Sequence, residues 1–168
     1  MIDTGPEWLP ELLRTGPGLV LAKFIGALAA GFVLGFDREK MGRSAGLRTH
    51  MLVSLAAAAT AVLALDLSDA LHARHQSVNA DPMRIIEGVV AAVGFIGGGI
   101  IIRSGGQVRG LTTAANLWIC GVTGLAFGAG FFALGALVLA LAFAVLVLLR
   151  GLEIGMGTKP ADDGDGKA

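Results

Sequence analysis

The amino-acid sequence predicts an all-α, polytopic membrane protein with five transmembrane helices. Hydrophobic residues make up 54% of its 168 residues and charged residues 15%, whereas soluble domains average about 25% charged residues. The mean hydropathy is +0.73. The apolar residues also fall into runs of the length that a helix needs to cross a hydrocarbon core, about 17 to 25 residues. These features together place the chain in a lipid bilayer.

The first three crossings are predicted from apolar runs that charged loops separate. The runs are Leu19–Phe36, Thr49–Leu65 and Ile85–Ile102. Each run contains a single titratable residue close to its start, and these residues are Lys23, His50 and Glu87. Since a charge near the end of a crossing can reach the interface, all three runs remain long enough to span.

The fourth and fifth crossings come from one uncharged stretch, Gly110 to Leu149, which is 40 residues long. As a single helix it would measure about 60 Å at 1.5 Å per residue, which is twice the thickness of a hydrocarbon core. The stretch must therefore turn back once, and Gly128-Ala129-Gly130 offers the flexible backbone for that turn.

The orientation follows from the distribution of lysine and arginine over the loops. Loops and termini on one side of the five crossings carry nine of these residues, against three on the other side. Because cytoplasmic loops carry the excess of positive charge, we expect the N-terminus outside and the C-terminus in the cytoplasm.

Three segments are expected along the chain. Residues 1–18 form an interfacial lead-in, and the acidic residues Asp3, Glu7 and Glu11 argue against a cleaved signal peptide there. Residues 19–150 form the transmembrane domain. Residues 151–168 are polar and are expected to be a disordered cytoplasmic tail.

Charge and composition also disfavour several function classes. Thirteen basic and thirteen acidic residues cancel, so no net field attracts nucleic acid. The single cysteine, Cys120, excludes an intramolecular disulfide and a thiolate metal cluster. No nucleophile stands beside a base, so we predict a non-enzymatic protein with no cofactor and no metal. The triplet Asp69, His72 and His75 leaves a weak alternative of metal binding.

Glycines spaced by four residues mark helix faces that can approach another helix closely. The predicted packing residues are Gly31, Gly35, Gly94, Gly97, Gly98, Gly124 and Gly128. The run Gly97–Gly99 has a second interpretation, because three successive glycines lower helix propensity. A broken helix there would expose backbone carbonyls to an ion or a substrate.

Polar residues gather at the predicted cytoplasmic ends of the crossings. The candidate functional cluster consists of Asp37, Arg38, Arg48, Thr49, Arg103, Arg109 and Thr113. Such a cluster can form ion pairs that fix helix ends, or it can bind a phosphate or a lipid head group. Both interpretations remain open from the residues alone.

The outer side carries a predicted helix start. Asp81 is a good N-cap and Pro82 suits the first helical position, while Arg84 and Glu87 lie three residues apart and can pair. Glu87 is also a carboxylate at the membrane edge, which makes it a candidate for handling a proton or cation. In the fourth crossing, we expect Asn116 to form an interhelical hydrogen bond.

Five sequence blocks, in order and in register, resemble the MgtC/SapB family of bacterial inner-membrane proteins. The resemblance covers roughly Leu19 to Gly130. The blocks are Gly35-Phe36-Asp37-Arg38-Glu39, Ala45-Gly46-Leu47-Arg48-Thr49, Asp81-Pro82-Met83-Arg84-Ile85, Gly94-Phe95-Ile96-Gly97-Gly98-Gly99 and Val108-Arg109-Gly110-Leu111-Thr112-Thr113-Ala114-Ala115.

The chain departs from the family pattern in places. Asp37 stands where Glu is usual, and Asn116 stands where Thr is common. Well-studied members carry a soluble ACT-like domain after the last crossing, so we expect this chain to correspond to the membrane module alone. The residues carried over by position are Asp37, Arg38, Gly46, Leu47, Arg48, Thr49, Asp81, Pro82, Arg84, Gly94, Gly97, Arg109, Gly110 and Thr113.

The resemblance implies a role in adaptation to low magnesium and in virulence, by restraint of the F-type ATP synthase. We therefore expect a multi-pass inner-membrane regulator that binds a membrane protein partner, with a homo-oligomer as a further possibility. The alternative is a transporter or channel for Mg²⁺ or protons, and an accessory lipid-binding protein is a third hypothesis.

Overall fold

The computed structural model describes residues 16–43, 45–73, 81, 83–104 and 107–155. In this part of the chain, five helices and one short β-hairpin are present. The helices are α2 (Pro17–Lys40), α3 (Leu47–Ala73), α4 (Met83–Ile100), α5 (Leu111–Gly128) and α6 (Phe132–Gly155), and the strands are β1 (Ile102–Ser104) and β2 (Gln107–Arg109). The predicted lead-in up to residue 15 and the tail from residue 156 lie outside the described residues.

The helices have the length and composition of membrane-spanning segments. Among the described residues, α2, α3, α4 and α5 are each long and apolar enough to cross a bilayer, and α6 contributes the apolar stretch Phe132–Leu148. The predicted all-α, polytopic membrane fold is thus confirmed. The predicted orientation of the chain across the membrane stays a prediction.

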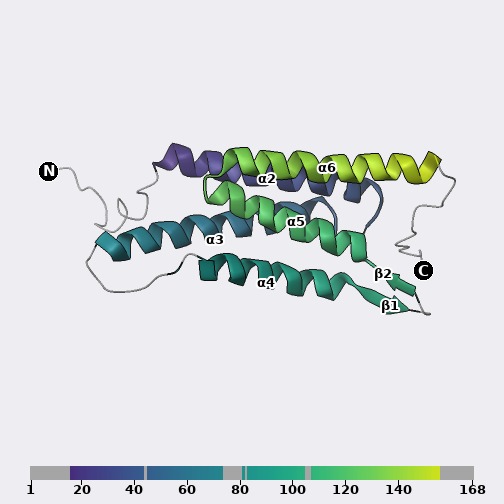
Figure 1. The fold of residues 1–168 in the computed structure, drawn as a ribbon, viewed down its shortest axis with the longest axis horizontal. Helices are drawn as coiled ribbons and strands as arrows, with labels where there is room; N and C mark the ends of the chain where they lie inside the picture. The colour runs from purple at the N-terminus through teal and green to yellow at the C-terminus, as the bar shows by residue number, and fades with distance from the viewer. Residues whose placement is uncertain (1–15, 44, 74–80, 82, 105–106, 156–168) are drawn as a thin grey trace.

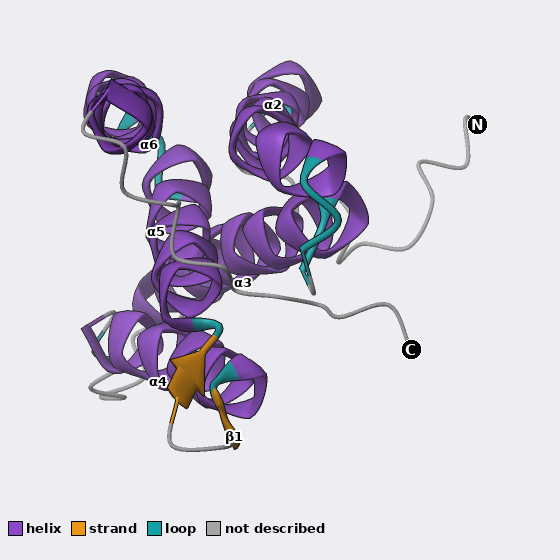
Figure 2. Cartoon of the chain, turned by 90° about the vertical axis from the view of Figure 1, so that its right-hand side faces the viewer, coloured by secondary structure: helices purple, strands orange, loops and turns teal. Residues whose placement is uncertain are grey.

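Helix α5 occupies the centre of the bundle. It contacts α2, α3, α4 and α6, and the view along the helices places it between α4 and α6 (Figure 2). In its most apolar stretch 61% of the residues are buried, against 11% in α4. Polar side chains on α5 are therefore the ones best placed to meet groups from several other helices.

Small residues allow α2, α3 and α5 to pack closely. A Cβ added to Gly31 of α2 would lie 2.6 Å from the Cα atom of Met51 in α3. A Cβ on Gly124 or Gly128 of α5 would overlap the backbone carbonyl of Ser54 or Ala58 in α3. Without a solvent that drives helices together, such close backbone contact is a main source of helix association in lipid.

The glycine run of α4 does not break the helix. The helix continues through Gly97–Gly99 to Ile100, so the interpretation of this run as a broken helix with exposed carbonyls is wrong. Inside a bilayer no water replaces lost backbone hydrogen bonds, and glycines keep the helical ones. Gly97 serves packing instead, since a Cβ there would lie 3.5 Å from the Cβ of Ala114 in α5.

The connection between α4 and α5 is a β-hairpin, which the sequence did not predict. Strands β1 and β2 pair antiparallel (Figure 1). Arg103 lies opposite Val108 and Ile102 opposite Arg109. Gly110 then joins β2 to α5 with a φ of 83°. A side chain there would lie 2.5 Å from the Ile100 carbonyl oxygen, so both the dihedral angle and the space require glycine.

The turn between α5 and α6 lies where the glycines indicated it. Gly130 adopts a φ of 86°, and its N–H donates to the Phe127 carbonyl at 3.0 Å, while Phe131 N–H donates to Ala126 at 2.8 Å. This is the usual left-handed helix ending that glycine permits. It lets α6 fold back along α5, and α6 runs on to Gly155, past the boundary at residue 150 drawn from the sequence.

Candidate functional site

Buried polar side chains gather between α2, α3 and α5, near the end of the bundle that carries the hairpin. We call this group the polar core, and it consists of Arg38, His50, Thr113, Asn116 and Cys120. The exposed fraction of each residue is 5% or less. Because ionisable and strongly polar groups are costly inside a membrane, their presence marks either function or the fixing of helices.

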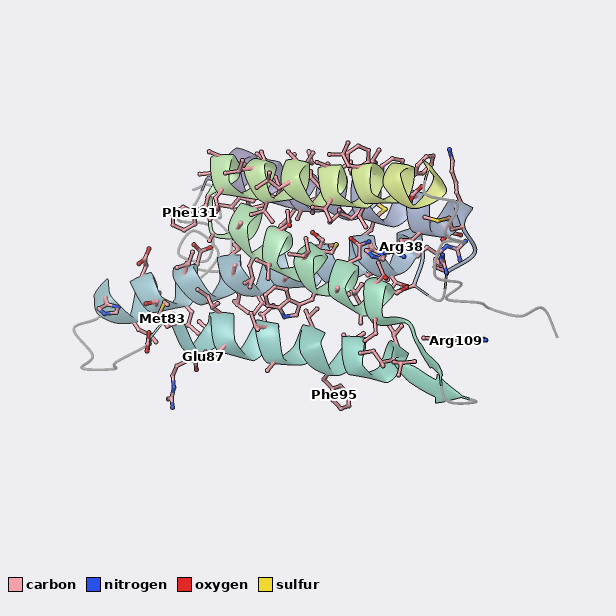
Figure 3. The ribbon with its side chains drawn as sticks, turned by 45° about the vertical axis from the view of Figure 1, so that its right-hand side comes forward. Arg38, Met83, Glu87, Phe95, Arg109 and Phe131 are labelled. Atoms are coloured by element: carbon pink, nitrogen blue, oxygen red, sulfur yellow. The ribbon has the colours of Figure 1, made fainter. Side chains whose placement is uncertain are left out.

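Arg38 links the end of α2 to the beginning of α5. Its Nη2 donates a hydrogen bond to the Thr112 carbonyl at 3.3 Å, and the side chain lies between the helices (Figure 3). The positive charge also suits the last turn of α2, where helix carbonyls point outward. Arg38 therefore holds two helix ends that lie 74 residues apart in the sequence.

His50 and Asn116 form a hydrogen-bonded chain through the polar core. The Nδ1 atom of His50 lies 2.9 Å from the Gly46 carbonyl oxygen. The Nδ2 atom of Asn116 lies 3.0 Å from His50 Nε2 and 3.1 Å from the Leu34 carbonyl oxygen.

These distances assign the proton on the imidazole ring. A carbonyl oxygen only accepts, so Nδ1 of His50 is the donor to Gly46 and Nε2 is left with a lone pair. The amide of Asn116 donates one N–H to that lone pair and the other to Leu34. One side chain of α5 thereby joins both α2 and α3, and the hydrogen bond expected for Asn116 from the sequence is present.

Two further hydrogen bonds extend the contact between the helices. Cys120 Sγ donates to the His50 carbonyl at 3.2 Å, and Ser54 Oγ donates to the Ala27 carbonyl at 2.7 Å. Such interhelical bonds are worth about 0.6 to 2 kcal/mol each in lipid. The polar core thus holds α2, α3 and α5 together mostly through side chains that bond backbone carbonyls.

Thr113 is the exception within the polar core. Its side chain is 1% exposed, and its Oγ1 has no hydrogen-bond partner among the described residues. A buried hydroxyl without a partner costs about 1 to 3 kcal/mol. The geometry gives no structural reason for a threonine here.

The start of α3 is capped by a residue that the sequence analysis did not select. Glu39, at the end of α2, accepts a hydrogen bond from the Leu47 N–H through its Oε2 at 2.9 Å. A Cβ on Gly46 would overlap that oxygen. The motif Asp37-Arg38-Glu39 followed by Gly46-Leu47 therefore fixes the connection between the two helices.

The members of the predicted cytoplasmic cluster differ in burial and in the elements that carry them. Arg38 and Thr113 belong to the polar core, whereas Arg48 is exposed and Thr49 and Asp37 are half-buried at the helix ends. Arg103 and Arg109 lie in the two strands of the hairpin, and Arg109 marks the hairpin end of the molecule (Figure 3).

His50 and Glu39 are the site residues that sequence reasoning missed. His50 had a usable signal, because a titratable residue inside a membrane helix is a functional candidate by default. Glu39 had none, since it caps a helix that begins eight residues later, across a loop whose path the sequence does not reveal.

The residues predicted to lie on the outer side form a conventional helix start. Asp81 Oδ1 accepts a hydrogen bond from Met83 N–H at 2.9 Å, which is the predicted N-cap contact. Arg84 and Glu87 are exposed in the first turns of α4, and Glu87 lies at the end opposite the hairpin (Figure 3). Pro82 lies outside the described residues.

The triplet Asp69, His72 and His75, which left metal binding as a weak alternative, lies only partly within the described residues. There, no group of three His, Cys, Asp or Glu side chains could hold a metal ion. His72 bonds the Ser68 carbonyl through Nδ1 at 2.7 Å, Asp69 is exposed, and His75 lies outside the described residues.

Comparison with known proteins identifies relatives of this chain. The chain is 37% identical over 117 residues to "Putative magnesium transporter YhiD" of Escherichia coli, covering 69% of this chain and 53% of that protein. It is 38% identical over 127 residues to "Protein MgtC" of Brucella abortus, covering 76% and 50%. The chain therefore spans about half the length of these curated relatives.

The chain was also compared with solved structures and with protein-family models. No solved structure matches the chain. The family model described as "MgtC family" matches residues 24–154, which include the polar core, the hairpin and nearly all of the described helices. The chain belongs to the MgtC family.

Proposed function

We propose that this protein is a non-enzymatic regulator of the bacterial inner membrane, which supports adaptation to low magnesium by binding another membrane protein. The proposed partner is the F-type ATP synthase, whose proton pumping it would restrain. Membership of the MgtC family and the magnesium-related names of the relatives support the link to magnesium. The observation that carries the binding role is the open face of α4.

The open face of α4 consists of Gly94, Phe95 and Gly98. No atom lies within 4 Å of a Cβ added to Gly94 or Gly98, and Phe95 is 85% exposed (Figure 3). The pairs Gly31–Gly35 of α2 and Gly124–Gly128 of α5 differ in this respect, since they already contact α3. A pair of glycines spaced by four residues and open to lipid lets a partner helix approach closely.

The inner side of α4 packs against α5, which holds the open face in place. Val93 contacts Gly121 of α5, where an added Cβ would lie 2.9 Å from the valine Cγ2, and Gly97 faces Ala114. Helix α4 is thus held on α5 by one side while its other side remains open. A larger residue at Gly94 or Gly98 should block a partner without disturbing the bundle.

The test compares three single variants for partner binding and for activity. Gly94→Leu and Gly98→Leu obstruct the open face, while Gly18→Leu is the matched control, because Gly18 is equally open but lies on α2. Each protein is expressed at equal levels, co-purification with the ATP synthase is measured, and ATP-driven proton pumping is recorded in inverted vesicles with a proton-leak control.

We expect the unaltered protein and Gly18→Leu to co-purify with the synthase and to slow pumping without added leak. Gly94→Leu and Gly98→Leu should do neither, because the leucine side chain keeps the partner helix away. Slow pumping that persists in both of these variants would contradict recognition through α4.

A second candidate function is transport of Mg²⁺ or protons. The name of the Escherichia coli relative supports it. So do the buried ionisable residues Arg38 and His50, which lie in helices long enough to cross a membrane. Purified protein in liposomes distinguishes the two functions. Flux of Mg²⁺ or protons above that of empty vesicles would favour the transporter, and flux equal to that of empty vesicles would favour the regulator.

A further inference from the structure

We infer that His50 is a proton-binding site, and that binding of a second proton to its ring is coupled to separation of α5 from α2 and α3. The inference rests on the hydrogen bonds of the closed bundle, in which each ring nitrogen has one role. Nδ1 donates to Gly46, and Nε2 accepts from Asn116. The closed bundle therefore holds the ring in its neutral form.

A second proton creates a conflict that the closed bundle cannot resolve. It makes Nε2 a donor, which then faces the donating Nδ2 of Asn116 at 3.0 Å. Rotation of the Asn116 amide would offer Oδ1 to the ring. The same oxygen would then face the Leu34 carbonyl oxygen, which in the closed bundle accepts from Nδ2 at 3.1 Å. Either arrangement removes a hydrogen bond between α5 and its neighbours.

The Gly46 carbonyl stabilises the proton on Nδ1 of His50, whereas the charged side chains around the ring do not favour a second proton. On α2, the Arg38 guanidinium interacts unfavourably with a positive imidazole, Gly35 packs on the His50 Cβ, and Glu39 is bonded to the Leu47 N–H. On α5, Cys120 donates to the His50 carbonyl. The described charged side chains of α4 are Arg84 and Glu87, at the opposite end of the bundle.

The ring therefore binds its second proton when the polar core opens and water reaches it. A solvated imidazole takes up this proton at about pH 6.5. If the closed state keeps the ring neutral, linkage raises the opening equilibrium by about thirtyfold between about pH 7.5 and about pH 5. This value is the expected size of the effect.

Cys120 provides a direct measurement of opening. It is the single cysteine of the sequence, it is fully buried, and its Sγ lies 3.2 Å from the His50 carbonyl oxygen. The purified chain in lipid nanodiscs is treated with N-ethylmaleimide at a series of pH values. Each rate is divided by the rate of the detergent-unfolded protein at the same pH, which cancels the titration of the thiol itself.

We expect the normalised rate to rise by about thirtyfold from about pH 7.5 to about pH 5. In His50→Gln the rise should disappear, because glutamine offers an acceptor to Asn116 and does not titrate. His72→Gln is the matched control. His72 also lies on α3 and bonds the carbonyl four residues before it through Nδ1, but its side chain is exposed. This control variant should keep the full rise.

Asn116→Thr decides the matter if His50→Gln does not fold. A hydroxyl can donate to the neutral ring, and it can also accept from the charged ring while it donates to Leu34. The closed bundle would then tolerate the proton, so the rise should be lost. A flat profile in the unaltered chain, or a rise that survives in either variant, would overturn the inference. The measurement needs no partner, so it is independent of the proposed function.

Discussion

At the scale of single residues, the polar core shows how this membrane protein uses hydrogen bonds. The Asn116 amide donates hydrogen bonds to groups of two other helices, Leu34 of α2 and His50 of α3. His50 in turn donates to the Gly46 carbonyl. An interhelical bond by Asn116 could be predicted, because an amide inside an apolar helix requires a partner. The identity of the partners could not, since Leu34, His50 and Asn116 belong to three helices whose relative rotation no local pattern encodes.

Replacement of Asn116 by leucine should destabilise the folded protein by about 1 to 3 kcal/mol. The variant leaves the Nε2 atom of His50 and the Leu34 carbonyl without their donor, and buried groups without partners carry that cost. Unfolding in lipid–detergent mixtures measures the change. Thr60→Ala removes an exposed hydroxyl that bonds within its own helix, and a loss as large as that of Asn116→Leu would contradict the explanation.

A second residue-scale prediction concerns the cap of α3. Gly46→Ala and Glu39→Ala should each cost about 1 kcal/mol, because both remove the contact between the Glu39 carboxylate and the Leu47 N–H. The double variant should cost much less than the sum, since the second substitution finds the contact already lost. Additive costs in this double-mutant cycle would show that the two residues act separately.

At the scale of helices, similar glycine patterns have different roles. The pairs in α2 and α5 contact the backbone of α3, while Gly94 and Gly98 of α4 remain open. All of these pairs look alike in the sequence, because four-residue spacing defines a face but not what covers it. The position of α5 at the centre of the bundle decides which faces are used.

The contrast predicts opposite effects of one substitution on stability. Gly124→Ala should destabilise the bundle by about 1 to 3 kcal/mol, because the added methyl group overlaps the Ser54 backbone. Gly98→Ala should change stability little, and it can stabilise α4 because alanine is the better helix former. Thermal unfolding of both variants in the same detergent tests the pair, and equal losses would be incompatible with the packing described here.

At the scale of the whole molecule, the two ends of the bundle differ in charge. The hairpin end carries Arg43 and Arg48, around the connection between α2 and α3, and Arg103 and Arg109 of the hairpin. The positive-inside rule therefore predicts that this end faces the cytoplasm. Helix length and composition determine that the chain spans the bilayer, but they do not show which end of the bundle faces the cytoplasm.

Cysteine labelling tests this orientation in a Cys120→Ser background. A cysteine at Arg43, near the hairpin end, should react with an impermeant maleimide only in inverted vesicles. A cysteine at exposed Asp81, on the opposite side, should react in intact spheroplasts. The reverse pattern would place the polar core near the outer face of the membrane.

The sequence by itself determined the membrane class, the all-α fold, the N-cap at Asp81 and the turn at Gly130. Each of these depends on local length or local backbone chemistry, which one segment carries alone. Only the tertiary structure decided that the Gly97–Gly99 run stays helical, that Glu39 caps α3, and that His50 and Asn116 meet. These features depend on which helix faces come together, and that choice results from close packing of the whole bundle around α5.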